Sequence, residues 1–308
     1  MSTGRTTPIL VTGPPRSGTT WVGMTLALDP SLGYLHEPFN ILTSHGVSPS
    51  RFTRMFQHVD ERNEARYAPG LERAMRFDHA LGPALAEARS PRDLARVLRD
   101  RRRFQIARRE GRRPLLKDPI AVFSAEWFAS RYAADVVLTI RHPAAVAGSF
   151  KRLGWQPRFR FLAEQDALVD GLLSPFAAEL HEYARGPQPP LESGAFLWRL
   201  IAYVLVGYRE RHPDWTLVRQ EDLARDPLTL YAALFESLGL SFDGAVRAEV
   251  AANSSAENAD ALSRPHAIKL DSRAAVASWK KHLSAEEIAR VRAITGETAD
   301  AFYAAEDW

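Results

Sequence analysis

The stretch GPPRSGTT, at positions 13–20, combines the residue types that bind phosphate groups in proteins. Gly13 and Gly18 permit a tight turn, and Arg16 brings a fixed positive charge. The apolar run PILVT precedes the stretch and a helical pattern follows it, so backbone N–H groups and the positive end of a helix dipole would face one anion. Thr19 stands where the ATP-binding pattern G-x-x-x-x-G-K-[ST] has its lysine. These residues predict a loop for a single phosphate rather than a triphosphate with Mg²⁺; an ordinary strand-to-helix turn is the alternative.

A second basic and hydroxyl pair lies in VVLTIRHPAAVAGSFKRLGW, at positions 136–155. Arg141 ends an apolar strand pattern, and Ser149 follows eight residues later on the helix that we expect next. A guanidinium forms paired, charge-assisted hydrogen bonds with a phosphate, and a serine hydroxyl adds one more. Taken singly, the arginine is compatible with a salt-bridged strand end and the serine with an ordinary helix position. The pair at this spacing predicts a second phosphate contact.

Short β-rich runs alternate with helical patterns along the chain, and these elements must position the candidate residues. We expect strands at 8–13, 113–119, 135–143 and 215–222, and a helix at 19–28. Val, Ile and Leu without clear alternation favour strands covered on both faces, which predicts an α/β fold with a P-loop-type open parallel sheet and helices on both faces. Ligands of such folds bind at the carboxyl ends of the strands. Gly13, Glu37, Lys117 and Arg141 fall at or near such ends, so we expect one site.

The length and composition limit the class of protein. A chain of 308 residues with 45% hydrophobic and 25% charged residues is typical of a globular protein, and we expect a single domain over 1–308. Helical excursions are expected at about 45–112 and 156–212. The chain has no cysteine, which excludes a disulfide framework, a thiolate metal site and a cysteine nucleophile. No secretory signal or membrane-spanning pattern is present, so we expect a cytoplasmic protein.

The segment PRSGTTW, at positions 15–21, resembles the 5′-phosphosulfate-binding loop of sulfotransferases that use 3′-phosphoadenosine 5′-phosphosulfate (PAPS). The resemblance implies that the 5′-phosphate and sulfonate are bound by Arg16, Ser17, Gly18, Thr19 and Thr20. It also implies that Trp21 lies against the adenine. The arginine and serine of the second segment resemble the pair that binds the donor's 3′-phosphate in this family, which assigns that role to Arg141 and Ser149.

Three further segments resemble the same family. RQEDLARDP (219–227) is similar to a family stretch in which an adenine-side tyrosine is frequent where this chain has Gln220. ASWKKHLS (277–284) is similar to a C-terminal segment, and the resemblance implies that Arg273 or Lys269 covers the 3′-phosphate. LHEPFN (35–40) is similar to bacterial and carbohydrate-type members, which favours the Golgi and carbohydrate-type branch over the cytosolic one.

Sulfonate transfer needs a base for the acceptor hydroxyl and positive charge for the leaving group. Cytosolic members use the histidine of a Lys-Thr-His segment, but aligning Lys117 with that lysine places Pro119 at the histidine position. Golgi-type members use a glutamate soon after the first helix, and Glu37 occupies that place. We therefore expect Glu37 to be the base, with Lys117 and Arg16 stabilising the developing charge.

Two neighbouring residues compete with Glu37 as the base. A histidine such as His36 titrates near neutral pH, whereas an Asp-Pro pair such as Asp118-Pro119 more often marks a turn. Burial beside the leaving group predicts a pKa above the ordinary value for Glu37. A loop cap is the alternative role for Glu37, and a strand-end ion pair is the alternative for Lys117.

Residues 95–113 hold nine arginines among nineteen residues. Such a run is typical of a solvated helix face, and contact with an acidic acceptor or with nucleic acid is the alternative. We expect no nucleic-acid partner, because one basic helix is weak evidence for one.

The sequence and the resemblance thus predict transfer of a sulfonate group from PAPS to a hydroxyl acceptor, without a metal ion. The resemblance implies that the acceptor is a glycan, a lipid or a small-molecule natural product. A P-loop nucleotide or small-molecule kinase with a degenerate Walker A loop is the first alternative. A non-catalytic protein that binds nucleotides or polyanions is the second.

Overall fold

The computed structural model describes residues 6–50, 52–254 and 276–308. The described chain divides into two compact units. The first comprises the residues up to Thr12 together with Gly23–Val136, and the second comprises Gly13–Val22 together with Val137–Trp308. The single domain over 1–308 stays a prediction.

The first unit contains three parallel strands in the order β2-β3-β1. Their bounds are Ile9–Thr12 for β1, Leu32–His36 for β2 and Arg113–Lys117 for β3. Lys117 pairs with Val11 on one side and with His36 on the other, so the carboxyl ends of all three strands are aligned. The apolar residues of β1 are wholly buried, as expected for a parallel strand that is covered on both faces.

Helices of the first unit follow the strands in the chain. They are α2 (Glu64–Met75), α3 (Leu81–Glu87), α4 (Pro91–Arg109), the 3₁₀ helix η1 (Pro119–Ser124) and α5 (Ala125–Tyr132). The longest, α4, begins at a cap in which the Ser90 side chain accepts from the Asp93 backbone N–H, with Pro91 in the first turn. Its buried residues are only Val97, Phe104 and Ala107, so most of its circumference faces solvent.

The second unit holds the parallel strand pair β4 (Asp135–Ile140) and β5 (Thr216–Arg219), in register from Val137–Thr216 to Ile140–Arg219. Its helices before β5 are α6 (Pro143–Leu153), α7 (Arg160–Ala163), α8 (Asp166–Asp170), η2 (Ser174–Phe176), α9 (Ala177–Ala184) and α10 (Pro190–Arg211). Those after β5 are α11 (Gln220–Arg225), α12 (Pro227–Ser237), α13 (Gly244–Asn253), η4 (Ser278–Lys281), α15 (Ala285–Asp300) and η5 (Ala305–Asp307).

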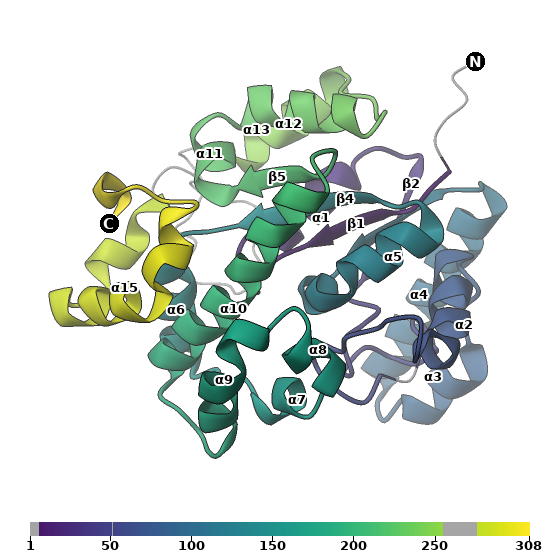
Figure 1. Ribbon diagram of the computed structural model, residues 1–308. Coiled ribbons are helices and arrows are strands. Elements are labelled where there is room, and N and C mark those ends of the chain that lie inside the picture. The colour runs from purple at the N-terminus through teal and green to yellow at the C-terminus, as the bar shows by residue number, and fades with distance from the viewer. Residues whose placement is uncertain (1–5, 51, 255–275) are drawn as a thin grey trace. The chain divides into compact units, whose positions relative to one another are not determined.

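Helix α10 packs along α6 and α15 (Figure 1). Small side chains at Ala144, Ala147 and Ala195 let the helices approach closely, and Trp279 and Val291 fill the remaining space. This core fixes α6, which follows β4 and carries Ser149. Helix α1 (Thr19–Leu26) follows the loop after β1.

The predicted α/β class with parallel strands is confirmed. All four predicted strands occur within or close to the expected ranges, and β2 is a fifth. The excursion at 45–112 is helical only from Glu64 onward, and the described residues before it, 41–50 and 52–63, form turns and irregular segments. None of the helices in the described ranges has the length and apolar character that crossing a bilayer requires.

Candidate active site

The loop between β1 and α1 owes its shape to two glycines of the second unit. Gly13 has φ 145° and Gly18 has φ 93°, a region that other residues rarely adopt. A side chain at Gly13 would collide with the backbone of Thr139, and one at Gly18 would press against Gln220. Arg16 also has a positive φ, of 72°, a strained backbone of the kind that clusters at functional sites.

The Ser17 side chain fastens this loop to the end of β4. Its buried hydroxyl lies 2.7 Å from that of Thr139, and its backbone N–H donates to the carbonyl of Pro14 at 3.1 Å. Thr19 is buried at the first position of α1, whereas Thr20 is half-buried. The hydroxyl of Ser17 therefore holds the loop, in addition to any contact with a phosphate.

Three arginines gather around the loop. Arg16 Nε donates to Ser149 Oγ at 3.0 Å, and Arg141 Nη1 donates to the Arg16 carbonyl at 3.4 Å. Burial, together with the like charges of Arg141 and Arg152, lowers the pKa of Arg16 to about 10. Guanidinium groups that repel one another in a partly buried place form an anion-binding site, because an anion relieves the repulsion.

The turn between β4 and α6 is held from several sides. The Trp198 ring N–H donates to the Arg141 carbonyl at 2.8 Å, and the buried Glu221 accepts from the His142 backbone N–H at 2.8 Å. The His142 side chain caps α6 by accepting from Ala144. Burial lowers the pKa of Arg141, while the charge of Glu221 opposes this shift. These hydrogen bonds fix the backbone of the turn that carries Arg141.

Aromatic rings border the same loop. The ring of Trp21 packs edge-on against Tyr231, with 5.6 Å between centroids. The Arg16 guanidinium lies 5.7 Å from the ring centroid of Trp155, which is exposed. The carbonyl oxygen of the Gln220 side chain is buried without a hydrogen-bond partner among the described residues. A flat ligand with an amino group suits these surroundings.

The structure brings Arg16, Ser149 and Arg141 together, and their roles toward the donor stay predictions. Sequence reasoning missed Arg152, although it lies one helical turn beyond Ser149 on α6 and this spacing would have identified it. Arg273 and Lys269, the candidates for the 3′-phosphate cover, lie outside the described residues.

Glu37 is the centre of a second polar cluster, within the first unit. It follows the last residue of β2 with φ 49°, and its backbone N–H donates to the Lys117 carbonyl at 2.9 Å. Lys117 Nζ lies 2.5 Å from Glu37 Oε1, and Asn40 Nδ2 donates to Oε2 at 2.7 Å. The Thr43 hydroxyl donates to the Glu37 carbonyl at 2.8 Å. Both carboxylate oxygens are therefore oriented, and Asn40 is a residue that sequence reasoning missed.

The pKa of Glu37 differs from the expectation. Burial by itself raises its pKa, but the ion pair with Lys117 and the hydrogen bonds from Lys117 and Asn40 outweigh burial, so the pKa lies below its ordinary value. The prediction of a raised pKa is wrong for this arrangement, because a lysine that is only 1% exposed compensates the carboxylate. Glu37 is ionised at neutral pH and ready to accept a proton.

The two competing bases have different surroundings. The His36 side chain is 56% exposed, its Nε2 lies 3.9 Å from Glu37 Oε1, and its Nδ1 is 3.3 Å from the Tyr34 hydroxyl. Asp118 is fully buried and caps η1, accepting from the backbone N–H groups of Phe39 at 2.6 Å and Ile120 at 2.9 Å. Burial and the charge of Glu37 raise the pKa of Asp118 to about 8. Asp118 is a turn residue that fixes the backbone after Glu37.

Helix α1 passes over Lys117 at Gly23. A side chain at Gly23 would come within 3 Å of the Lys117 Cβ and Cγ atoms and would press on the Tyr34 ring. The glycine therefore lets the helix cover the lysine and exclude water from it.

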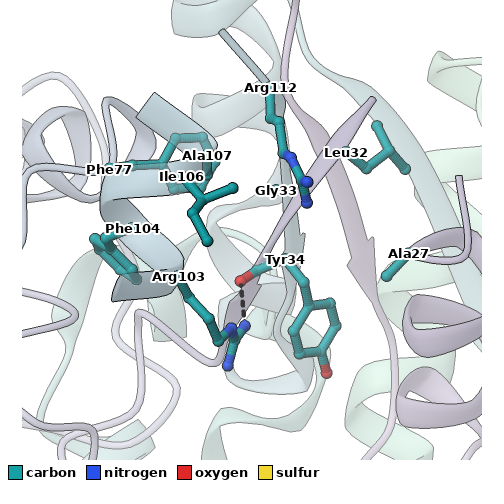
Figure 2. Close-up of a pocket in the computed structure, with 10 residues that line it drawn as sticks. All are labelled: Ala27, Leu32, Gly33, Tyr34, Phe77, Arg103, Phe104, Ile106, Ala107 and Arg112. Carbon is teal, nitrogen blue, oxygen red and sulfur yellow. Dashed lines mark hydrogen bonds between the residues drawn. The ribbon is translucent and has the colours of Figure 1, made fainter. Parts of the chain in front are cut away.

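A cavity of about 280 Å³ lies in the first unit, between α4 and β2 (Figure 2). It is lined by Ala27, Leu32, Gly33, Tyr34, Phe77, Arg103, Phe104, Ile106, Ala107 and Arg112. Arg103 donates to the Tyr34 carbonyl at 3.2 Å, so the helix satisfies an edge-strand acceptor. Within the described residues, no group of three His, Cys, Asp or Glu side chains is placed to hold a metal ion.

Comparison with solved structures finds the same architecture in sulfotransferases. The sulfotransferase domain of the Synechococcus PCC 7002 olefin synthase is similar with a TM-score of 0.50 and 18% identity, over 99% of this chain and 98% of that one. Sulfotransferase STF9 from Mycobacterium avium has a TM-score of 0.46 and 17% identity, over 96% and 76% of the two chains. Mouse sulfotransferase SULT7A1, solved with PAP, has a TM-score of 0.45 and 12% identity, over 99% and 88%. At these identities the likeness concerns the fold alone.

The sequence comparisons settle the family. No curated protein matches the chain. The model of the sulfotransferase family matches residues 8–244, which is well over half of the chain and includes the loop, Glu37, Lys117 and the Arg141–Ser149 segment. The chain belongs to the sulfotransferase family and is a sulfotransferase enzyme.

Proposed function

We propose that this enzyme transfers a sulfonate group from PAPS to a hydroxyl acceptor, with Glu37 as the base. The observation that carries the proposal is the arrangement of Arg16 and Arg141 around the loop and Ser149, with the charge of Arg152 acting on Arg16. An ATP-binding loop places a lysine on the terminal phosphates, and this loop has Thr19 there instead.

The surroundings of the loop fit a nucleotide with phosphates at two places. Arg141 and Ser149 are proposed to hold the 3′-phosphate, and Arg16 with the N-terminus of α1 the 5′-phosphosulfate. The half-buried Trp21 is proposed to lie along the adenine. When bound, PAPS supplies the sulfonate and a bisphosphate leaving group.

On the acceptor side, the ionised Glu37 is proposed to take the proton of the attacking hydroxyl. The acceptor O–H bond breaks as its oxygen forms a bond to sulfur, the bond from sulfur to the phosphate oxygen breaks, and the proton moves to a carboxylate oxygen of Glu37. Lys117 and Asn40 keep that carboxylate ionised and oriented beforehand. Lys117 is further proposed to stabilise the charge that develops during transfer, and Arg16 that on the leaving phosphate.

The finer parts of the proposal rest on the same residues. A glutamate base supports placement near the Golgi and carbohydrate-type branch rather than the cytosolic one. Fixed guanidinium and ammonium groups supply the positive charge that Mg²⁺ supplies in kinases, so the proposed reaction needs no metal ion. A glycan, a lipid or a small natural product is the proposed class of acceptor.

A thermal-shift panel tests the donor directly. We expect PAP to raise the melting temperature, whereas ATP with Mg²⁺ and an RNA oligomer leave it nearly unchanged. The Arg141→Ala variant serves as the control and should lose most of the PAP shift. A shift with ATP and Mg²⁺ but not with PAP would favour the kinase alternative. Mass spectrometry of an extract treated with enzyme and PAPS, seeking an added sulfonate, identifies the acceptor.

A further inference from the structure

Positive charge is concentrated on α4 and the residues beside it. Residues 89–112 contain ten arginines and three acidic residues, a net charge of +7, whereas the whole chain carries +3. The rest of the protein is therefore net acidic. Because α4 buries only three of its side chains, this charge faces solvent. Such a field attracts anionic partners to one face of the first unit.

Some of these arginines are neutralised within the protein and some are not. Arg96, Arg99 and Arg103 pair with Asp93 or Asp100 along the same helix. Across the part of the chain that the structure describes, no ion pair is formed by Arg92, Arg101, Arg102 and Arg109. The helix therefore carries a second set of arginines whose charge no acidic side chain of the described residues neutralises.

Exposed apolar side chains lie on the same stripe of α4 as the uncompensated arginines. Leu94 and Leu98 are one turn apart and are 44% and 62% exposed. Arg101, Arg102 and Arg109 continue the stripe at helical spacing, and we call these five residues the α4 stripe. The α4 stripe therefore presents apolar and basic side chains together on one exposed face of the helix.

We propose that the α4 stripe docks the protein on an anionic lipid surface, with the arginines at the headgroups and the leucines entering the boundary of the acyl chains. A basic helix with apolar side chains on its free face is typical of contact with a membrane surface. Single-stranded nucleic acid, by contrast, is held by aromatic rings that stack on bases, and the aromatic residue of α4, Phe104, is buried. An anionic lipid surface uses both kinds of exposed side chain.

Sedimentation with lipid vesicles tests the proposal on the full-length protein. We expect binding to vesicles of phosphatidylcholine mixed with phosphatidylglycerol, and none to vesicles of phosphatidylcholine alone. Added salt should weaken the binding, because the headgroup attraction is screened. Absence of binding to the anionic vesicles, or equal binding to both kinds, overturns the proposal.

Paired substitutions locate the contact. Arg102→Gln with Arg109→Gln should lower the partition coefficient by about 25-fold, since one arginine near an anionic membrane contributes about five-fold. Arg158→Gln with Arg160→Gln removes the same charge from two exposed arginines of the second unit and should leave binding close to wild type. Equal losses in the two variants would mean that net charge, and not the α4 stripe, governs binding.

The leucines distinguish a lipid surface from other polyanions. Leu94→Ser with Leu98→Ser should lower binding to the anionic vesicles by about ten-fold at unchanged charge. All these positions are exposed, so circular dichroism should show wild-type folding and calorimetry wild-type affinity for PAP. If the leucine variant binds vesicles as the wild type does, or if an RNA oligomer binds more tightly than the vesicles, α4 is a polyanion-binding helix and the proposal fails.

Discussion

Lys117 Nζ lies 2.5 Å from Glu37 Oε1, and the lysine is 1% exposed while the glutamate is 18% exposed. The pair thus joins a buried cation to a glutamate whose side chain is partly exposed. An ammonium in this place keeps the carboxylate ionised before an acceptor binds. This geometry suits a base whose ionisation and orientation are fixed before the substrate binds.

Removing the lysine should destabilise the protein and raise the pKa of Glu37. Lys117→Met leaves a carboxylate partly buried without its partner, and we expect the free energy of unfolding to fall by about 3 kcal/mol. Urea unfolding measures this. The double variant Lys117→Met with Glu37→Gln should recover part of the loss, because no charge is then left uncompensated. Strictly additive losses would show that the two side chains do not interact.

Asp118 gives the protein a distinct dependence of stability on pH. Its folded-state pKa of about 8 lies above the ordinary value of about 3.9, so the unfolded chain releases this proton first as the pH rises. The protonated side chain's contribution is therefore full at low pH and is lost between about pH 4 and pH 8. Urea unfolding across this range should give a smaller decline for Asp118→Asn than for wild type. An identical slope would contradict the raised pKa.

Gly23 should be intolerant of a side chain. Gly23→Ala places a methyl group against the Lys117 stem and should cost about 1–3 kcal/mol of stability while lowering the turnover rate through the displaced lysine. Gly82→Ala is the matched control, because that helical glycine has open space around it and should tolerate alanine. Thermal unfolding compares the two. Equal stability of both variants would show that α1 does not press on Lys117.

The 3′-phosphate contact should depend on the pair at 141 and 149. Arg141→Ala should weaken PAP binding by about 2–4 kcal/mol, as a charge-assisted contact in a partly buried place. Ser149→Ala should cost about 0.5–1.5 kcal/mol, as the loss of one hydroxyl. Calorimetry with PAP and with its analogue lacking the 3′-phosphate separates the roles. A loss of equal size for both ligands would rule out the assignment.

Local sequence pattern was sufficient to predict much of the fold and the loop between β1 and α1. The apolar runs that became β1, β3 and β4 are largely buried and β5 is half-buried, and the composition of each run marks it as a strand. β2, with the sequence LGYLH, has Gly33 and Tyr34 at its centre, and it is a strand because β3 offers a partner. Its existence depends on a contact far along the chain, which local pattern does not contain.

In the candidate site, too, local pattern identified residues but not the contacts between residues far apart in the chain. Arg16, Arg141 and Ser149 were identifiable by type and spacing, but the bond between Arg16 and Ser149 joins residues 133 positions apart. The pKa of Glu37 was predicted in the wrong direction because Lys117, 80 residues away, decides it. Leu94 and Leu98 stand at helical spacing beside Val97 and would be assigned to the core by periodicity, yet only Val97 is buried.

Initial rates of Glu37→Gln test the proposed mechanism most directly. With saturating radiolabelled PAPS and the acceptor fraction of an extract, we expect the rate to fall by about 10²–10⁴-fold, because the amide keeps the shape and cannot accept the proton. PAP affinity by calorimetry should stay at the wild-type value, and His36→Ala should lower the rate only modestly. A Glu37→Gln enzyme that turns over near the wild-type rate, while His36→Ala or Asp118→Asn is inactive, would contradict the assignment of Glu37 as the base.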